Sequence, residues 1–334
     1  MFIETPTSQN CVHASLNSNL PKHIETRIEL AMQQTTIRLP QRWVNGSALE
    51  QTLRAGPAPF EGSSSDVHFH VPSRCNLMTE AAVRLLSLLN QLDHATRRVI
   101  IDFEDNEDVL GYLNRIGFFE VLSPNVSVLP KRPPAAKVRH YRGRNPNLVE
   151  IQRIDRNHRD GDLPKRLTEA IGHACENRPD VHELEGAAWT ILAELIDNVF
   201  DHSETKLDGF AALQVYPKGN CLKVAVSDSG RGLLSTLRPA LQNQAPKLAE
   251  LRDVDLIVEV FRQGLSRYGA ERGCGLKGCA DKAIKFGAEL DVRLPQDRVL
   301  LVSRKSGFTP NRAYCYSGLP LIWGTHICFK IDLD

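Results

Sequence analysis

Residues 187–204 of this 334-residue chain read AAWTILAELIDNVFDHSE, and this stretch does most to decide the fold. Its apolar residues recur on one broad side at helical spacing, which predicts a helix over residues 181–202. Glu194, Asn198 and Asp201 are spaced by four and three residues, so they share the opposite side of that helix. Taken alone, this pattern is typical of a surface helix with a solvated polar face.

A second motif, DSGRG at residues 228–232, lies at the end of a predicted strand. Residues 210–216 and 222–228 are predicted to be strands, and the second of them leads into this motif. The carboxylate of Asp228 only accepts hydrogen bonds, so it can bind an exocyclic amine such as that of adenine. Gly230 and Gly232 lack a Cβ atom, which lets a backbone pass close to a ring or a phosphate. The same motif also occurs in simple turns.

A third motif, RGCGLKG at residues 272–278, leads into a helix predicted over residues 276–286. Glycines in this position can point backbone N–H groups at phosphates, and a helix N-terminus adds positive potential. Lys277 can add a point charge. The segment lacks the lysine-serine or lysine-threonine pair of a Walker loop and does not fit the dinucleotide-binding fingerprint.

The order of these motifs is more specific than any one of them. E-x-x-x-N, D-x-G-x-G, G-x-G-L-x-G and a last strand entered through Gly324 and Thr325 resemble the GHKL superfamily, the gyrase, chaperone, histidine kinase and MutL type of ATPase with the Bergerat fold. The resemblance covers about residues 163–334. It implies an α/β sandwich of two layers, in which a mixed, mostly antiparallel sheet carries helices on one face.

The resemblance also implies ATP and Mg²⁺ as ligands and a role for each motif residue. Glu194 would be the general base that activates water, and Asn198 would hold Mg²⁺ against the phosphates. This agrees with general chemistry, because Mg²⁺ keeps waters and phosphate oxygens as ligands and phosphoryl transfer needs a positioned base. The nucleotide-binding candidates are Asn198, Asp228, Gly230, Gly232, Gly273, Gly275, Leu276, Lys277, Gly278 and Thr325.

Residues 233–272 form a polar, helical insertion, which we expect to close as a lid over the triphosphate and exclude water. Some relatives supply a lysine to the γ-phosphate from a further domain, and Arg231, Arg272 and Lys277 are the candidates for that charge here. Three functions remain open. They are ATP hydrolysis that drives a conformational switch, a serine/threonine protein kinase of the anti-sigma type, and a nucleotide-gated binding protein without turnover.

The first half of the chain predicts a second, smaller α/β unit. Alternating apolar residues predict a strand at 67–71, and RVIIDF predicts a buried strand at 98–103. Helical patterns over 78–92 and 105–116 follow these strands, which implies parallel pairing. Over residues 66–130 the pattern resembles the STAS-type, anti-anti-sigma fold, and the resemblance implies a protein partner for this module.

We therefore expect four parts and a cytoplasmic protein. Net charge is +1, no apolar run is long enough for a membrane span, and the N-terminus lacks the pattern of a secretory signal. The eight cysteines show no CxxC pair and are expected to be free thiols; His68 and His70 are expected on a solvated strand face, not at a metal. Nucleic acid is not an expected partner, and the resemblance is compatible with a homodimer. The four parts are a polar extension (1–65), the small module (66–130), a basic linker (131–162) and the ATP-binding domain (163–334). The linker is expected to include a short strand over residues 148–154.

Overall fold

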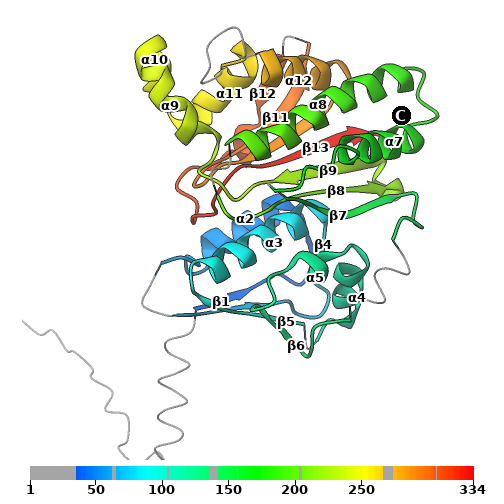
Figure 1. Cartoon of the computed structure of the whole chain (residues 1–334), viewed down its shortest axis with the longest axis vertical. Coiled ribbons are helices and arrows are strands. Elements are labelled where there is room, and N and C mark those ends of the chain that lie inside the picture. The colour runs from blue at the N-terminus through cyan, green and yellow to red at the C-terminus, as the bar shows by residue number, and fades with distance from the viewer. Residues whose placement is uncertain are drawn as a thin grey trace, which may run out of the picture.

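The computed structural model shows a mixed α/β protein of the α+β class, with one parallel and one antiparallel sheet. Figure 1 shows four layers in order: the parallel sheet, two helices, the antiparallel sheet and an outer group of helices. For residues 201, 202 and 274–276 only the backbone is described. The structure describes residues 35–61, 65–103, 105–134, 142–155, 157–202, 205–265, 274–305 and 307–334.

The antiparallel sheet has seven strands in the order β12-β11-β10-β13-β9-β8-β7. The predicted strands of this half are confirmed with small shifts at their ends, whereas β12 was not predicted. β7 lies inside the predicted basic linker and pairs with β8 at one edge of the sheet. The strands are β7 (Leu148–Ile154), β8 (Gly209–Tyr216), β9 (Cys221–Ser227), β10 (Glu289–Arg293), β11 (Arg298–Arg304), β12 (Gly307–Pro310) and β13 (His326–Asp332).

Helices cover one face of this sheet and bury its apolar side chains in a single core. The predicted helices at 181–202 and 276–286 are confirmed as α8 and α12, with α12 beginning two residues earlier than predicted. The helices of this layer are α7 (Leu163–Ala174), α8 (Val181–His202), α9 (Leu233–Gln244), α10 (Pro246–Ala249), α11 (Asp253–Gln263) and α12 (Cys274–Lys285); short 3-10 turns follow β8 (Pro217–Gly219) and β12 (Arg312–Tyr314).

The insertion predicted to be a lid is largely part of this core. Leu234, Leu237 and Leu241 of α9 and Ile257 and Val260 of α11 are buried among the helices and the sheet. Moving them would expose apolar surface that is buried in the folded protein. The packing of α9 and α11 therefore does not support a lid that moves as a whole over residues 233–272, and residues 266–272 of the predicted lid lie outside the described residues.

The parallel sheet has the order β1-β3-β5-β6, so the predicted parallel pairing of the first half is confirmed. Strand β1 and helix α2 lie within residues 1–65, the segment predicted to be a polar extension. The elements are β1 (Thr35–Arg38), β2 (Trp43–Val44), α2 (Gly46–Ala55), β3 (Asp66–His70), β4 (Asn76–Leu77), α3 (Thr79–His94), β5 (Arg98–Asp102), α4 (Glu107–Arg115), α5 (Phe118–Val121) and β6 (Ser127–Leu129), with β2 and β4 forming a separate pair.

Helix α3 lies between the two sheets and is buried on all sides over residues 79–92. Its apolar residues belong to the core beneath the antiparallel sheet, and its polar residues Glu80, Arg84 and Ser87 meet the second face of that sheet. On that sheet the alternation of β9 directs Lys223, Ala225 and Ser227 toward α3, where Lys223 binds Glu80 at 2.5 Å. The expected arrangement, helices on one face of the sheet only, therefore differs from the structure.

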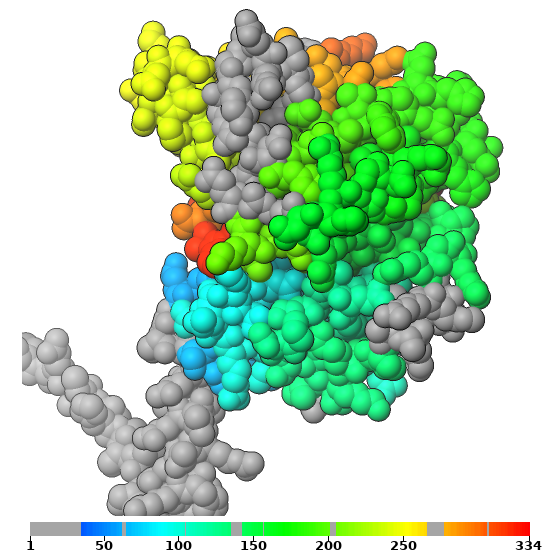
Figure 2. All heavy atoms as spheres, in the orientation of Figure 1, coloured from blue at the N-terminus to red at the C-terminus, as the bar shows by residue number. Residues whose placement is uncertain are grey.

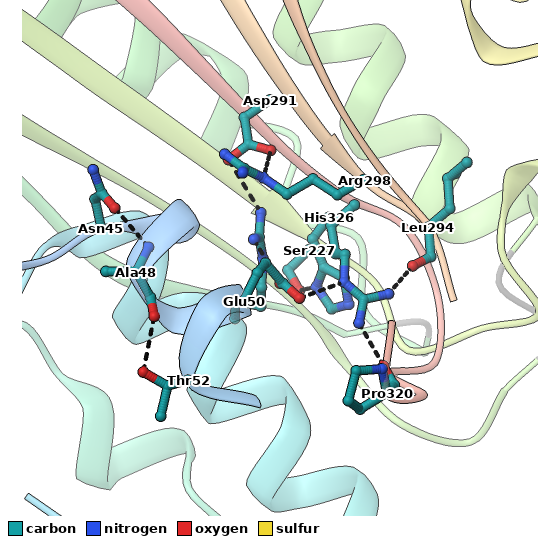
Figure 3. A network of polar contacts seen from close by, with 12 residues as sticks. Asn45, Ala48, Glu50, Thr52, Ser227, Asp291, Leu294, Arg298, Pro320 and His326 are labelled. Carbon is teal, nitrogen blue, oxygen red and sulfur yellow. Dashed lines mark hydrogen bonds and ion pairs between the residues drawn. The ribbon is translucent and has the colours of Figure 1, made fainter. Parts of the chain in front are cut away.

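Buried charges hold these layers together (Figure 3). Glu50 of α2 has no exposed surface and lies between Arg84 of α3 (2.9 Å) and Arg293 of β10 (3.0 Å). Asp291 of β10 binds Arg298 at 2.8 Å and lies 3.5 Å from Arg84. Burial by itself raises the pKa of Asp291, but the attraction of Arg84 and Arg298 outweighs it and lowers that pKa. Figure 2 shows the two halves of the chain in direct contact along this junction.

We predict that Glu50→Gln lowers the free energy of unfolding by about 3–5 kcal/mol, because Arg84 and Arg293 would remain buried with one negative partner fewer. Urea unfolding followed by circular dichroism measures the change. The matched control is Glu169→Gln, which breaks an exposed contact with Lys165 at 3.8 Å and should change stability by less than about 0.5 kcal/mol. Equal effects of the two substitutions would contradict a stabilising role for the buried charges.

Candidate functional site

Two strand ends that are far apart in the sequence meet at the centre of the antiparallel sheet. Ser227, the last residue of β9, pairs with His326, the first residue of β13. The next residue outward on each strand is therefore Asp228 on β9 and Thr325 on β13. The backbone N–H of Asp228 donates to the carbonyl of Thr325 at 3.0 Å, so the antiparallel pairing continues one step beyond the strands.

The carboxylate of Asp228 is held by three neighbouring groups. Its Oδ1 accepts from the N–H of Gly230 at 2.7 Å, and its Oδ2 accepts from the N–H of Thr325 at 3.0 Å. Desolvation raises the pKa of Asp228 to about 6, against the opposing effect of these hydrogen bonds and of the Thr325 hydroxyl. Asp228 is therefore an ionised, oriented hydrogen-bond acceptor at neutral pH.

Glycines permit the tight backbone around this carboxylate. Gly324 has φ of +88°, and a Cβ atom there would lie 2.2 Å from the carbonyl oxygen of Asp228. Gly232 has φ of +84°, and its Cβ atom would meet Pro295 at 2.7 Å. The positive φ and the contact with Pro295 both require glycine at position 232. The reason expected from the sequence was a different one, namely the close approach of a ring or a phosphate.

A pocket opens beside Asp228. Four of the predicted residues line it together: Asn198, Asp228, Gly232 and Thr325. The hydroxyl oxygen of Thr325 accepts from the N–H of Leu233 at 2.9 Å, which ties the start of α9 to this wall. The remaining walls are apolar and come from Leu195, Val199, Val226, Leu233 and Ile327.

Glu194 lies one helical turn before Asn198 on α8 and is partly exposed. Burial and, secondly, the negative charge of Glu194 raise the pKa of Cys279 to about 12. Because Cys279 belongs to α12, this interaction indicates that Glu194 lies on the side of α8 that faces α12. The predicted base is therefore one helical turn from Asn198, which lines the pocket, and is not itself one of the lining residues.

The glycine-rich motif is described only in part. Gly273 lies outside the described residues, and Gly275 and Leu276 belong to the first turn of α12. The helix begins at Cys274 and not at residue 276, so the loop before it ends earlier than predicted. Gly278 has open space where a Cβ atom would be, and Lys277 is exposed. Of the motif residues whose side chains are described, neither Lys277 nor Gly278 lines the pocket.

The apolar walls were missed by sequence reasoning, although the sequence contains a signal for them. Side chains alternate between the two faces of a strand, so Val226 and Ile327 point toward the helical layer, where both belong to its core. Leu195 and Val199 were predicted as part of the apolar side of α8. They line the pocket as well as the core.

This arrangement suits a flat, largely apolar ring that carries a hydrogen-bond donor at its edge. The apolar walls can cover the faces of the ring, and Asp228 can accept the donor. The amide oxygen of Asn198 can coordinate a hard cation such as Mg²⁺ in company with ligand oxygens.

Across the described ranges, no group of three or more His, Cys, Asp or Glu side chains could hold a metal ion. His68 and His70 lie 3.4 and 3.6 Å from Asp102 on the neighbouring strand. The six cysteines whose side chains are described are free, as predicted. In the same part of the chain, no helix combines the length and apolar character needed to cross a bilayer.

Neither the comparison with protein-family models nor the comparison with curated proteins finds a match for this chain.

We predict that Gly324→Ala lowers the free energy of unfolding by about 2–5 kcal/mol, through left-handed strain and the clash with Asp228. Gly318→Ala is the matched control, because Gly318 has φ of +66° but no atom within 4 Å of its Cβ position. It should lose only about 1–2 kcal/mol. Urea unfolding of both variants separates the clash from the strain, and equal losses would contradict the close approach of Gly324 to Asp228.

Proposed function

We propose that this chain is an ATP-binding protein of the GHKL type, which binds ATP together with Mg²⁺ and hydrolyses the ATP. One observation carries the proposal: Asn198, Asp228, Gly232 and Thr325, chosen from sequence motifs alone, line the same pocket. They come from α8, from the ends of β9 and β13, and from the start of α9. The antiparallel sheet with helices α7, α8 and α12 on one face supports the Bergerat fold for this half.

Adenine fits the walls and the polar edge of this pocket. Its exocyclic amine is a donor, and Asp228 is an acceptor whose position is fixed by Gly230 and Thr325. The apolar side chains of Val226, Leu233 and Ile327 would cover the base. Guanine presents an acceptor where adenine presents its amine, so Asp228 would select adenine over guanine.

Asn198 is the residue that would hold Mg²⁺, since its amide lines the pocket beside the base site. The ion supplies charge neutralisation for the phosphates when it is bound. Glu194, one turn earlier on α8, would orient and deprotonate the attacking water. A carboxylate within one turn of the metal ligand can reach the phosphate end of the nucleotide without contacting the base.

We predict that Asp228→Asn weakens ATP binding by roughly 10- to 150-fold, the equivalent of 1.5–3 kcal/mol for a hydrogen bond to a charged group. Wild-type affinity should be full above pH 6 and should fall below it, because protonation removes the charge of Asp228, whose pKa is about 6. Affinity of the variant should show no such step. Calorimetric titrations with ATP from pH 5 to 8 measure both effects, and unchanged affinity at pH 7.5 would refute the adenine-binding role.

We predict that Glu194→Ala loses at least about 99% of Mg²⁺-dependent phosphate release while its affinity for ATP stays within about threefold. Removal of Mg²⁺ with a chelator should abolish release by the wild type. Glu185→Ala is the control, since it removes an acidic residue of α8 that lies near His182 at 3.3 Å and away from the pocket. Full turnover by the Glu194 variant would overturn the assignment of the base. Transfer of labelled phosphate to a protein, without release to water, would favour the kinase alternative.

A further inference from the structure

Helix α3, which belongs to the other half of the chain, reaches both strand ends that carry the proposed adenine-binding residues. Its contacts there come from Gln91, a side chain with no exposed surface. The Nε2 of Gln91 donates to the hydroxyl of Ser229 at 2.9 Å and to the carbonyl of Trp323 at 3.0 Å. Its Oε1 accepts from the N–H of Trp323 at 2.8 Å.

These three hydrogen bonds fix the orientation of the Gln91 amide. Both hydrogens of the Nε2 group and the oxygen are used, so the reverse orientation would face donor with donor at Trp323. Ser229 follows Asp228 directly, and Trp323 lies two residues before Thr325. One side chain therefore fastens the two backbone segments whose separation sets the width of the pocket at its polar end.

A second chain of hydrogen bonds from α3 reaches the same strands. Burial, followed by the charges of Arg84 and Arg293, lowers the pKa of His326 well below its usual value, so this ring is neutral. Its Nε2 lies 3.1 Å from the carbonyl of Trp323 and must carry the hydrogen. Nδ1 then accepts from the hydroxyl of Ser227, and the hydroxyl oxygens of Ser227 and Ser87 of α3 lie 2.7 Å apart.

Aromatic contacts complete the attachment of Trp323. Its ring stacks on Phe60 at 5.2 Å between centroids and lies edge-on to His94 at 6.2 Å. Both partners belong to the first half of the chain. The segment that presents Thr325 is thus held from α3 and from the loop after α2, in addition to its hydrogen bond with the start of α9.

We infer that Gln91 is a positioning residue for the nucleotide pocket, through which the N-terminal half of the chain controls the affinity for adenine nucleotides. The inference rests on the proposed function. Gln91 holds Ser229 and Trp323, which lie beside Asp228 and Thr325 in the chain, and all the hydrogen bonds of its amide are used there and not at Asn198 or Glu194 on α8. Its loss should therefore raise KM for ATP and leave kcat nearly unchanged. Because coupling is reciprocal, nucleotide binding should in turn stabilise α3.

Gln91→Met tests the inference, because methionine nearly preserves the volume and removes all three hydrogen bonds. Asn90→Leu is the matched control. Asn90 is a neighbouring, buried amide on α3, but it bonds to the carbonyl of Val121 at 3.1 Å and the N–H of Ser123 at 2.8 Å, within the first half. Both variants should lose comparable thermal stability. Only Gln91→Met should lose affinity for ATP, by about tenfold or more in calorimetry, with kcat within about twofold.

Hydrogen exchange of the full-length wild type, with and without ATP and Mg²⁺, gives a reading that does not depend on the variant's folding. We expect slower exchange of the α3 amides on nucleotide binding. Wild type that binds no ATP would overturn the proposed function and the inference together. Wild type that binds ATP, with no change of exchange in α3 or with equal affinities of the two variants, would overturn the positioning role of Gln91 alone.

Discussion

The structure depends on the pairing of Glu50 with Arg84 and Arg293 between the two sheets. Each of these side chains is buried, and an ion removed from water is stable only when oppositely charged partners replace its hydration. Glu50 comes from α2, Arg84 from α3 and Arg293 from β10. The three elements must therefore be in place together, which fixes the orientation of the first half on the antiparallel sheet.

This constraint determines what α3 can be. A helix between two sheets has no solvated side, so its polar residues need partners in the second sheet. Lys223 and Ser227 of β9 are such partners, and the small residues Ala212 and Ala225 between them allow the helix to approach closely. The polar side chains of α3 therefore make specific contacts and do not face solvent.

The same contacts extend to the candidate site. Arg293 donates to the carbonyls of Leu294 and Pro320, and Pro295 next to it packs where a Cβ atom of Gly232 would be. Gln91 binds Trp323 and Ser229 one step from the residues of the pocket. The pocket is thus shaped on one side by α8 and on the other by the layer beneath the sheet.

The sequence by itself determined most strands and helices of the second half, because periodicity is a local property, although β12 was not predicted. The resemblance of its motifs to the GHKL superfamily indicated four residues of the pocket, Asn198, Asp228, Gly232 and Thr325. Only the tertiary structure decided that Asp228 and Thr325, 97 residues apart, are neighbours, that the insertion after Gly232 is largely core, and that Glu50, Arg84 and Gln91 are buried. From sequence alone, charged and amide side chains on a helix are expected to be exposed. Their burial depends on partners from distant strands, and the sequence of the helix does not show those partners.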